Sequence, residues 1–362
     1  IFSLQTGVVY VAAAALGIAA DRYGVRRMLA FGTVTFLAGA VLTVLVRSFP
    51  ALLFAYGILT AIGLSAIYVV SYATVPRWFE RRRGLATGLA TSGLGVGMLV
   101  IPPAAEVLIR MLDWRGALLV IAVCATVGLI VATLLIRDSP AAIGPETDLS
   151  AEFPDGYTET EPFDRAAYRA ELWAIATSRR FLFVFAGWIG VYATMYVVFV
   201  HLVAHAGELG VGERAGVIAL AVIGVTTGLA RIVVGWLSDR VGRFRTFLAC
   251  SIAMAAATLA LAAVDSLVGL LAFAVAFGVA YGGNGALLSP LTADLFGRGN
   301  PNAVFGLVSL SFAVSGVSAP WGAGVIYDLQ GTYTPAFLLA GAVGLVGSGL
   351  VWLSGMQPAA TR

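Results

Sequence analysis

Arg231 is the residue whose type and setting point most directly to chemistry. It lies in the run 219–237, which carries no other charge and could cross a bilayer, since a spanning helix needs about 20 mostly apolar residues. A charge near mid-membrane costs roughly 2.5–3.5 kcal/mol on insertion scales and usually faces a bundle interior or a wet cavity. The planar guanidinium stays charged and fits a carboxylate bidentately. The sequence therefore predicts an anion site, with an arginine that snorkels to the interface as the alternative.

Titratable groups inside apolar runs are candidates for carrying protons. His201 and His205 lie one helical turn apart, and histidine titrates near physiological pH, so His201, the deeper one, is the better candidate. Interfacial packing is the alternative for both. Glu106, the only acid well inside a span, is a second proton-coupling candidate or an interfacial residue close to Arg110. No third ligand accompanies the histidines, so no metal site is predicted.

Polar tips on apolar helix faces are the remaining candidates for substrate contact. Tyr68, Tyr281 and Asn284 could hydrogen-bond a hydroxyl or keto group of a substrate, and His201 is a further candidate for substrate contact. Aromatic residues at helical spacing also serve in packing, which is the alternative. The sequence holds no phosphate loop and no nucleophile–base pair, so we expect neither an enzyme nor a cofactor. Transport driven by a gradient fits better, because no ATP-binding domain is present.

The elements that must position these residues are membrane-spanning helices. Hydrophobic residues make up 60% of the 362 residues and charged residues 11%, whereas soluble domains carry about 25% charged residues. The mean hydropathy is +0.94. Cys124 and Cys250 both fall inside apolar runs, so no disulfide framework is expected. The net charge of +3 resides in short loops and is not a nucleic-acid signal. We predict an all-α polytopic membrane protein.

Eleven apolar runs are long enough to span a membrane. A polar segment with several prolines and an acidic cluster separates the fifth run from the sixth. It is predicted to be a cytoplasmic linker, with a short amphipathic helix near 164–177. The runs cover residues 1–20, 28–46, 51–75, 84–109, 114–136, 180–206, 214–236, 246–264, 267–290, 302–326 and 334–355.

The placement of arginine orients the chain. One set of loops holds only Arg47, Arg110, Arg115 and Arg214, and the other set holds nearly all remaining arginines. The richer side is predicted to be cytoplasmic in the inner (plasma) membrane, with residue 1 outside and the C-terminus inside. Five spans before the linker and six after it suggest a scheme of twelve whose first helix is missing. The expected domains are an N-terminal bundle at 1–136, a linker at 137–179, a C-terminal bundle at 180–355 and a cytoplasmic tail at 356–362.

One pattern occurs twice, each time at the end of an apolar run. Gly24 and Gly242, the second glycine of each copy, are expected to allow a tight turn. Asp21 and Asp239 are expected to cap the next helix or to pair with the arginines. A parallel repeat of two six-helix halves is a known transporter plan. The copies are Gly17, Asp21, Arg22, Gly24 and Arg27, then Gly235, Asp239, Arg240, Gly242 and Arg245.

This doubled G-x-x-x-D-R-x-G pattern resembles the hallmark of the major facilitator superfamily, and the resemblance covers the whole chain. It implies a major facilitator fold of two pseudo-symmetric helical bundles and secondary transport by alternating access. It also implies that the ten residues of the repeat form a cytoplasmic gate, latched in the outward-open state. Solvated turns whose charges only set the topology are the alternative.

Looser matches resemble the monocarboxylate transporter and oxalate:formate antiporter branch. They lie at 77–88, 113–116, 199–203, 230–235 and 324–337. In that branch an arginine at the position of Arg231 binds the substrate carboxylate, so a small monocarboxylate such as lactate or pyruvate is expected. Proton-coupled members carry an acid one turn before that arginine, where this chain has Thr227. Proton symport is therefore a weaker expectation than carboxylate binding.

The expected partners are a small carboxylate, protons and the lipid bilayer, with no nucleic acid, and a monomer is expected. Exchange of oxalate- and formate-like anions competes with this hypothesis, but a dicarboxylate would want a second cation in the cavity. Drug efflux also competes and would favour a more acidic cavity. A membrane sensor or scaffold usually needs an output domain, and the linker is too short for one.

Overall fold

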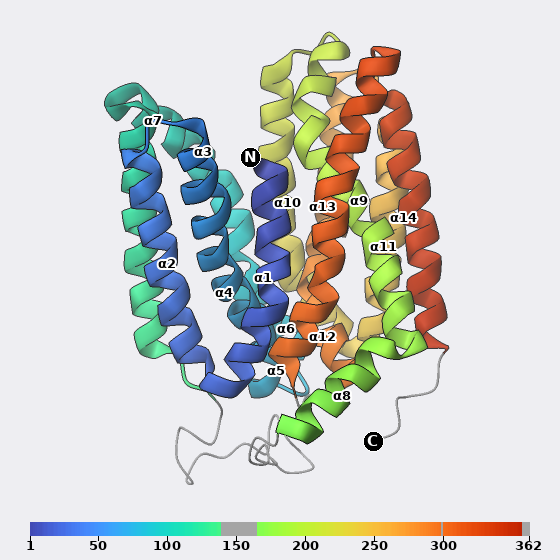
Figure 1. The fold of residues 1–362 in the computed structure, drawn as a ribbon. Coiled ribbons are helices and arrows are strands. Elements are labelled where there is room, and N and C mark those ends of the chain that lie inside the picture. Colours follow the sequence, from blue (N-terminus) through green and yellow to red (C-terminus); the bar gives the residue numbers. More distant parts are fainter. Residues whose placement is uncertain (139–164, 298–299, 357–362) are drawn as a thin grey trace. The chain divides into compact units, whose positions relative to one another are not determined.

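The computed structural model describes residues 1–138, 165–297 and 300–356, and the regular elements there are all helical (Figure 1). Residues 139–164 of the predicted linker and 357–362 of the predicted tail lie outside the described part. The amphipathic helix expected near 164–177 is confirmed as α8. The helices are α1 Phe2–Tyr23, α2 Val25–Leu45, α3 Phe49–Leu52, the π-helical η1 Leu53–Leu59, α4 Thr60–Ala73, α5 Val75–Trp78, α6 Arg83–Thr91, α7 Gly93–Leu135, α8 Arg165–Thr177, α9 Arg179–Glu208, α10 Glu213–Val241, α11 Arg243–Leu261, α12 Leu267–Phe296, α13 Pro301–Gln330 and α14 Thr334–Gly355.

Ten helical stretches of the described residues are long and apolar enough to cross a membrane. The longest, Arg83–Leu135, contains Asp113 at φ 65° and ψ 179°, which is not a helical conformation. The predicted runs 84–109 and 114–136 meet at this residue. The eleven apolar runs thus correspond to ten continuous stretches, and the all-α multi-pass architecture is confirmed.

Asp113 separates the predicted runs 84–109 and 114–136 because its side chain caps the start of a new helical segment. Its Oδ1 accepts the backbone N–H groups of Arg115 at 2.7 Å and of Gly116 at 2.9 Å. Aspartate also tolerates a positive φ better than most residues. Arg115 then donates to the carbonyls of Val44 at 3.1 Å and Val46 at 3.3 Å, at the end of α2. The Asp-Trp-Arg-Gly stretch is therefore a corner that ties α7 to α2.

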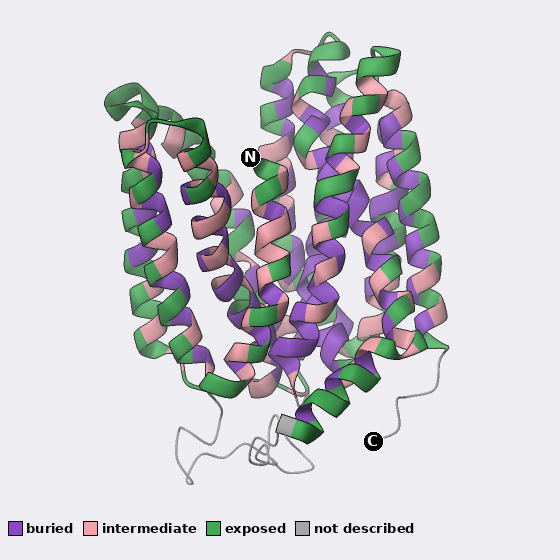
Figure 2. Ribbon diagram, viewed as in Figure 1, coloured by how far each residue is buried: buried purple, intermediate pink, exposed green. Residues whose placement is uncertain are grey.

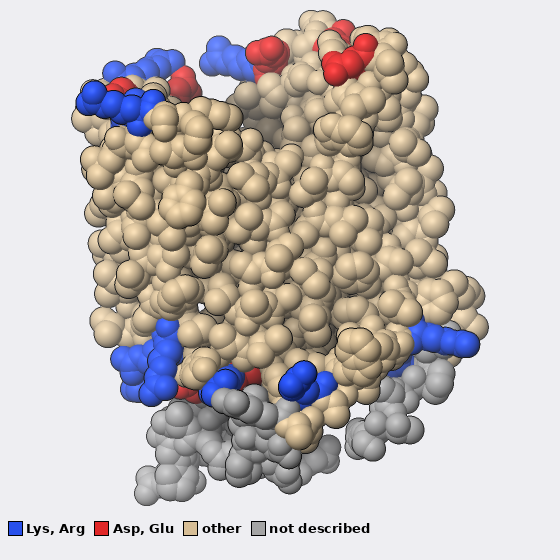
Figure 3. All heavy atoms as spheres, viewed as in Figure 1, with Lys and Arg blue, Asp and Glu red and all other residues tan. Residues whose placement is uncertain are grey.

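The distribution of side chains is that of a protein in lipid. On the face drawn in Figure 3, charged side chains lie near the helix ends and the broad band between them is uncharged. Large apolar side chains stand outward, with Leu135 74%, Val268 78% and Trp321 71% exposed. Figure 2 shows that exposed residues occur along most helices. Soluble monomers rarely expose apolar patches of this extent. A bilayer is the solvent that suits these faces.

Contacts divide the chain into two compact units, each described here by itself. Unit 1 comprises Ile1–Arg82, Ile101–Ala176 and Thr292–Ala313. Within it α1 and the start of α13 run antiparallel at very short range. A Cβ at Gly306 would lie 2.5 Å from the carbonyl oxygen of Ala13, and one at Gly17 would overlap that of Asn302. Small residues at these points allow the two backbones to touch.

Unit 2 comprises Arg83–Val100, Thr177–Leu291 and Val314–Arg362. Here α6 packs antiparallel on α10 by the same device. A Cβ at Gly84 would lie 2.5 Å from the carbonyl oxygen of Gly235, and one at Gly88 would overlap that of Arg231. Each unit therefore contains helices from both halves of the sequence. The division into bundles at 1–136 and 180–355 remains a prediction.

Candidate functional site

Arg231 is buried in unit 2, with only 1% of its surface exposed. Its guanidinium lies against α12, where a Cβ at Gly285 would be 2.5 Å from Nη2 and 2.9 Å from Cζ. The ring centroid of Tyr281, one turn earlier on α12, lies 5.8 Å from Cζ, within the range of a cation–π contact. The head group packs inside unit 2 instead of reaching out to a helix end. This geometry argues against the snorkelling alternative.

Glycines on α12 allow α10 to come this close. A Cβ at Gly282 would lie 2.6 Å from the carbonyl oxygen of Thr227, and one at Gly278 would lie 2.9 Å from that of Ile223. The contacts advance along both helices together, so α10 and α12 are parallel. The Thr227 hydroxyl donates to the Gly278 carbonyl at 3.1 Å. Thr227, which replaces the acid of the proton-coupled pattern, therefore holds the two helices together.

Aromatic rings form the apolar wall beside Arg231. The Tyr281 ring meets Phe199 of α9 edge to face, with centroids 5.3 Å apart, and lies 6.3 Å from Phe277. Tyr281 itself is 8% exposed. One cation among apolar and aromatic side chains is the usual composition of a site for a small organic ligand. Arg231 and Tyr281, both predicted from the sequence, are brought together here.

Asn284 is turned to a different side of α12. Its Oδ1 accepts the hydroxyl of Tyr192 on α9, and its Nδ2 donates to Ser251 Oγ on α11 at 2.7 Å. Asn284 and Ser251 are fully buried. The amide thus fixes the rotation of α12 that directs Gly285 toward Arg231. Direct substrate contact by Asn284 stays a prediction, and the geometry gives this residue a positioning part.

Tyr68 belongs to unit 1 and lies in an aromatic cluster of α1, α4 and α13. Its hydroxyl is 3.2 Å from Ser309 Oγ, and its ring lies 5.3 Å from Tyr10 and 5.4 Å from Phe305. Tyr68 and Arg231 fall in different units. Their joint contact with one substrate therefore stays a prediction.

The two histidines lie near the C-terminal end of α9 in unit 2. His201 Nε2 is 3.0 Å from the carbonyl oxygen of Pro320 on α13. His205 Nδ1 is 3.1 Å from Glu208 Oε2. The predicted roles of His201 in substrate contact and proton coupling are not decided by this geometry and stay predictions.

Glu106 lies in unit 1, on α7. Its Oε1 is 2.5 Å from Arg110 Nη2, and the two side chains are 63% and 77% exposed. Exposed pairs one turn apart contribute little to stability. The arrangement matches the interfacial alternative, and proton coupling through Glu106 stays a prediction.

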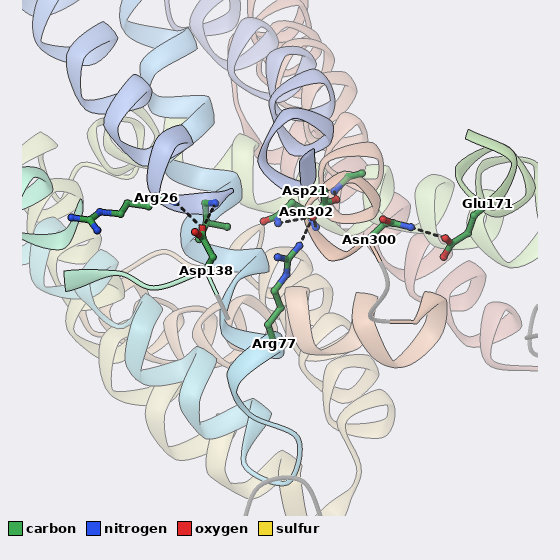
Figure 4. A network of polar contacts seen from close by, with 9 residues as sticks. Asp21, Arg26, Arg77, Asp138, Glu171, Asn300 and Asn302 are labelled. Atoms are coloured by element: carbon green, nitrogen blue, oxygen red, sulfur yellow. Dashed lines mark hydrogen bonds and ion pairs between the residues drawn. The ribbon is translucent and has the colours of Figure 1, made fainter. Parts of the chain in front are cut away.

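Asp21 of the first repeat copy caps a helix that is distant in sequence. Its Oδ2 accepts the N–H of Ala303 at 2.8 Å, and its Oδ1 accepts Asn302 Nδ2 at 2.7 Å, at the start of α13 (Figure 4). Arg77 forms an ion pair with the same carboxylate. An acid is stabilised at a helix N-terminus by unpaired N–H groups and by the helix dipole. The expected cap on the next helix is therefore wrong for Asp21, which binds 282 residues away.

The next helix, α2, is capped by Asp138 instead. Asp138 Oδ1 accepts the N–H groups of Val25 at 2.7 Å and Arg26 at 3.2 Å, while the Arg26 guanidinium points away (Figure 4). Gly24 adopts φ 90°, and a Cβ there would lie 2.9 Å from Asp138 Oδ1. The tight turn expected at Gly24 is confirmed, and the closeness of the carboxylate is a second reason for glycine.

Asp239 of the second copy repeats the arrangement in unit 2. It accepts the N–H groups of Gly84 and Leu85, each at 2.9 Å, and so caps α6. Arg243 pairs with the same carboxylate at 2.8 Å. Gly242 adopts φ 107°, which confirms the second tight turn. The prediction that Asp239 caps the next helix, α11, is wrong, because Asp239 caps α6. The expected pairing with an arginine is confirmed.

The arginine after each aspartate lies on an aromatic ring. Arg22 Cζ is 4.8 Å from the ring centroid of Tyr23, and Arg240 Cζ is 3.8 Å from that of Trp236. Stacking of this kind suits a side chain at the membrane interface. The gate role stays a prediction for all ten residues of the repeat, including Arg22, Arg27, Arg240 and Arg245.

Sequence reasoning does not single out Arg77, Asn302 or Asp138 as partners in this network. Their partners lie 56 or more residues away, so no local pattern joins them. A weak signal exists at the start of α13, because Pro301 stands at the first helical position, where proline is favoured. A helix start there calls for a cap, but the sequence does not say which acid provides it.

A family model described as Major Facilitator Superfamily matches residues 1–246 and 209–362. The chain belongs to the Major Facilitator Superfamily. The resemblance inferred from the doubled motif is thereby confirmed.

Similar curated proteins narrow the placement within the superfamily. The chain is 27% identical over 336 residues to monocarboxylate transporter 13 of Bos taurus, covering 91% of this chain and 74% of that protein. It is 29% identical over 340 residues to monocarboxylate transporter 11 of Homo sapiens, covering 90% and 68%. These relatives confirm the monocarboxylate transporter-like branch.

Solved structures support the fold alone. The E. coli fucose:proton symporter matches with a TM-score of 0.73 and 14% identity, over 97% of this chain and 90% of that one. The human organic anion transporter MFSD10 matches with a TM-score of 0.70 and 16% identity, over 96% and 82%. The major facilitator fold is confirmed. The relatives and the fold are those of transporters.

Proposed function

We propose that this superfamily member is a secondary active transporter of small monocarboxylates of the lactate or pyruvate kind. The observation that carries the proposal is the buried guanidinium of Arg231 between α10 and α12. A permanent cation inside a spanning helix is costly and marks a substrate or ion pathway by default. The relatives named monocarboxylate transporters give the anion its class.

In this proposal the two oxygens of the substrate carboxylate bind the two terminal nitrogens of Arg231. A bidentate pair of charged partners is stronger and more directional than a neutral hydrogen bond. The Tyr281 and Phe199 rings supply the apolar surface for the short carbon chain of the substrate. Gly285 keeps the space in which the guanidinium lies. The hypothesis for Tyr68 is a contact with the hydroxyl or keto group.

The doubled aspartate cap is proposed as the gate. Alternating access requires joints that form in one state and open in another. Asp21 of α1 holds the start of α13, and Asp239 of α10 holds the start of α6, in each case through backbone N–H groups and one ion pair of the aspartate. A joint of a few charge-assisted hydrogen bonds is strong enough to hold a state and weak enough to open. The C-terminus is proposed to be cytoplasmic, in the plasma membrane.

The test of the substrate site uses Arg231→Lys and Arg231→Ala in reconstituted vesicles. Uptake of labelled lactate should fall by roughly 10- to 100-fold, because hydrogen bonds to a charged partner contribute about 1.5–3 kcal/mol. Lysine keeps the charge but not the fork, so it should restore little. Arg110→Lys, at an exposed position, is the matched control. Wild-type uptake in both Arg231 variants would remove this residue from the mechanism.

Proton symport is the weaker part of the proposal, because Thr227 stands where an acid is expected. Acidification of the vesicle lumen during lactate entry would support symport. Lactate entry without acidification would favour uniport or anion exchange.

A further inference from the structure

A buried histidine and a glutamate join the end of α9 to the turn before α14. His205 is 2% exposed, and its Nδ1 lies 3.1 Å from Glu208 Oε2. The same carboxylate oxygen accepts the N–H of Tyr333 at 3.2 Å. Tyr333 is the residue before the first turn of α14. One oxygen atom therefore links α9 to the turn between α13 and α14, all within unit 2.

The other ring nitrogen of His205 is an orphan. Nε2 is buried and has no hydrogen-bond partner among the described residues. Glu208 accepts from Nδ1, so in the neutral ring Nδ1 carries the hydrogen and Nε2 keeps a lone pair. Buried polar atoms are nearly always hydrogen-bonded, and an exception calls for a functional explanation. The lone pair of Nε2 is the place where this ring can take up a second proton.

The surroundings of His205 can hold the charged form of the ring. The Glu208 carboxylate would become the counter-ion at 3.1 Å. The ring of Phe337 lies 4.8 Å from the imidazole, a distance at which an aromatic ring attracts a cation. A charged His205 ring would thus have a carboxylate and an aromatic ring as its neighbours.

His201 differs in the nature of its partner. Its Nε2 lies 3.0 Å from the Pro320 carbonyl, and its ring packs on Tyr333 at 4.8 Å. A carbonyl accepts a hydrogen bond from either protonation state of a histidine. Protonation of His201 would therefore create no ion pair with Pro320, whereas protonation of His205 would create one with Glu208.

Other titratable groups lie near His205 and Glu208. Burial, followed by the nearby Tyr327, Glu208 and Asp328, raises the pKa of Tyr333, so its phenol stays neutral around physiological pH. Glu213 at the start of α10 approaches the backbone of Gly207. The groups around the pair are His201, Glu213, Tyr327, Asp328 and Tyr333.

We propose that His205 and Glu208 form a proton-binding site that controls transport. A proton from water adds to Nε2 of His205, and the resulting imidazolium is held by the Glu208 carboxylate. Protonation turns a hydrogen bond between a neutral ring and a carboxylate into an ion pair. The link between α9 and the turn before α14 is therefore stronger when the site holds a proton than when it is empty. The transport consequence rests on the proposed function, whereas proton binding itself does not.

Proton binding is tested without transport. The chain has two histidines, so His201→Gln leaves His205 as the only one. This variant, labelled with ¹⁵N on the histidine ring and held in nanodiscs, is titrated from about pH 5 to about pH 8 by NMR. We expect the ring signals to pass between the neutral and the charged form. Signals that stay in one form across this range would overturn the proposal.

Transport is tested with His205→Gln and Glu208→Gln, and Asp265→Asn, at an exposed position between α11 and α12, serves as the control. Glutamine retains hydrogen bonding at both positions, and thermal unfolding checks that each variant is folded. Lactate uptake by the wild type and the control should differ by roughly tenfold between about pH 5.5 and about pH 7.5, and uptake by the two other variants should not. A wild-type pH response in His205→Gln, or none in the wild type, would contradict the inference. If no carboxylate is carried at all, the proposed function fails and the NMR titration still decides the proton site.

Discussion

At the scale of the residue, the hydrogen atom at Gly285 decides where Arg231 can place its head group. A methyl group there would meet the tip of a long flexible side chain, 2.5 Å from Nη2. At Gly282, one turn away on the same helix, a methyl group would instead meet the Thr227 backbone, 2.6 Å from its oxygen and 2.8 Å from Cα. Two glycines close together on α12 thus have different neighbours, one movable and one fixed.

This difference gives a prediction for two matched variants. Gly285→Ala should displace the guanidinium and lower lactate uptake by about tenfold, the effect of about 1.4 kcal/mol, with little change in thermal stability. Gly282→Ala should force α10 and α12 apart and lower the free energy of unfolding by about 1–3 kcal/mol. Uptake in vesicles and thermal unfolding in detergent measure the two effects. Equal behaviour of the two variants would show that Gly285 has no special relation to Arg231.

The sequence identifies a candidate site residue where its polarity or charge differs from that of the surrounding run. Arg231 is found because a charge in an apolar run is costly, and its burial in the structure agrees with that reasoning. Asn284 looks similar from sequence, as a polar group in an apolar run. Its bonds to Tyr192 and Ser251 come from two other helices, so only the structure shows that its amide is already engaged.

At the scale of the element, the start of α6 depends on one carboxylate. Asp239 satisfies two N–H groups there and also pairs with Arg243. Asp239→Ala should lower the free energy of unfolding by about 0.5–2 kcal/mol, the usual cost of losing a helix cap. Asp239→Asn keeps an acceptor oxygen and should cost less. Thermal unfolding of the purified protein measures both.

The control for this prediction is Asp265→Ala, which removes an exposed aspartate between α11 and α12. It should leave the midpoint of unfolding in place. A midpoint for Asp239→Ala equal to that of the control would show that the cap at α6 contributes nothing measurable.

Elements are predicted well from sequence where hydrophobicity alone defines them. The apolar runs recover the spans, and the break at Asp113 falls between two of them. The partners of the helix ends are not predicted, because Asp21 and Asp239 reach α13 and α6 and not the helices that follow them. A cap needs only an acid near free N–H groups, and many helix starts in the sequence could provide those.

At the scale of the whole molecule, the arginine distribution predicts an orientation that labelling can check. In a background with Cys124 and Cys250 replaced, single cysteines are placed at the exposed positions Arg47 and Arg26. Arg47→Cys should react with a membrane-impermeant maleimide in intact cells, and Arg26→Cys only after permeabilisation. The opposite pattern would reverse the topology and with it the proposed cytoplasmic gate.

Composition also predicts the membrane class of the whole chain, since 11% of its residues are charged and soluble domains carry about 25%. It does not predict how contacts group the helices. Unit 1 includes Thr292–Ala313 from the second half of the sequence, and unit 2 includes Arg83–Val100 from the first half. Glycines that let distant backbones touch produce this grouping, and a glycine in a single sequence does not reveal its neighbour.

The two aspartate caps recognise peptide N–H groups, at Ala303 in one case and at Gly84 and Leu85 in the other. Every amino acid except proline offers that donor. Substitutions at positions 303, 84 and 85 can therefore keep these backbone hydrogen bonds, within the space available, whereas the aspartates cannot be replaced. Only the side-chain bond of Asn302 to Asp21 depends on a residue type of a receiving helix. Proline at position 303 or 85 would remove one backbone hydrogen bond from a joint and leave every charge of the molecule in place.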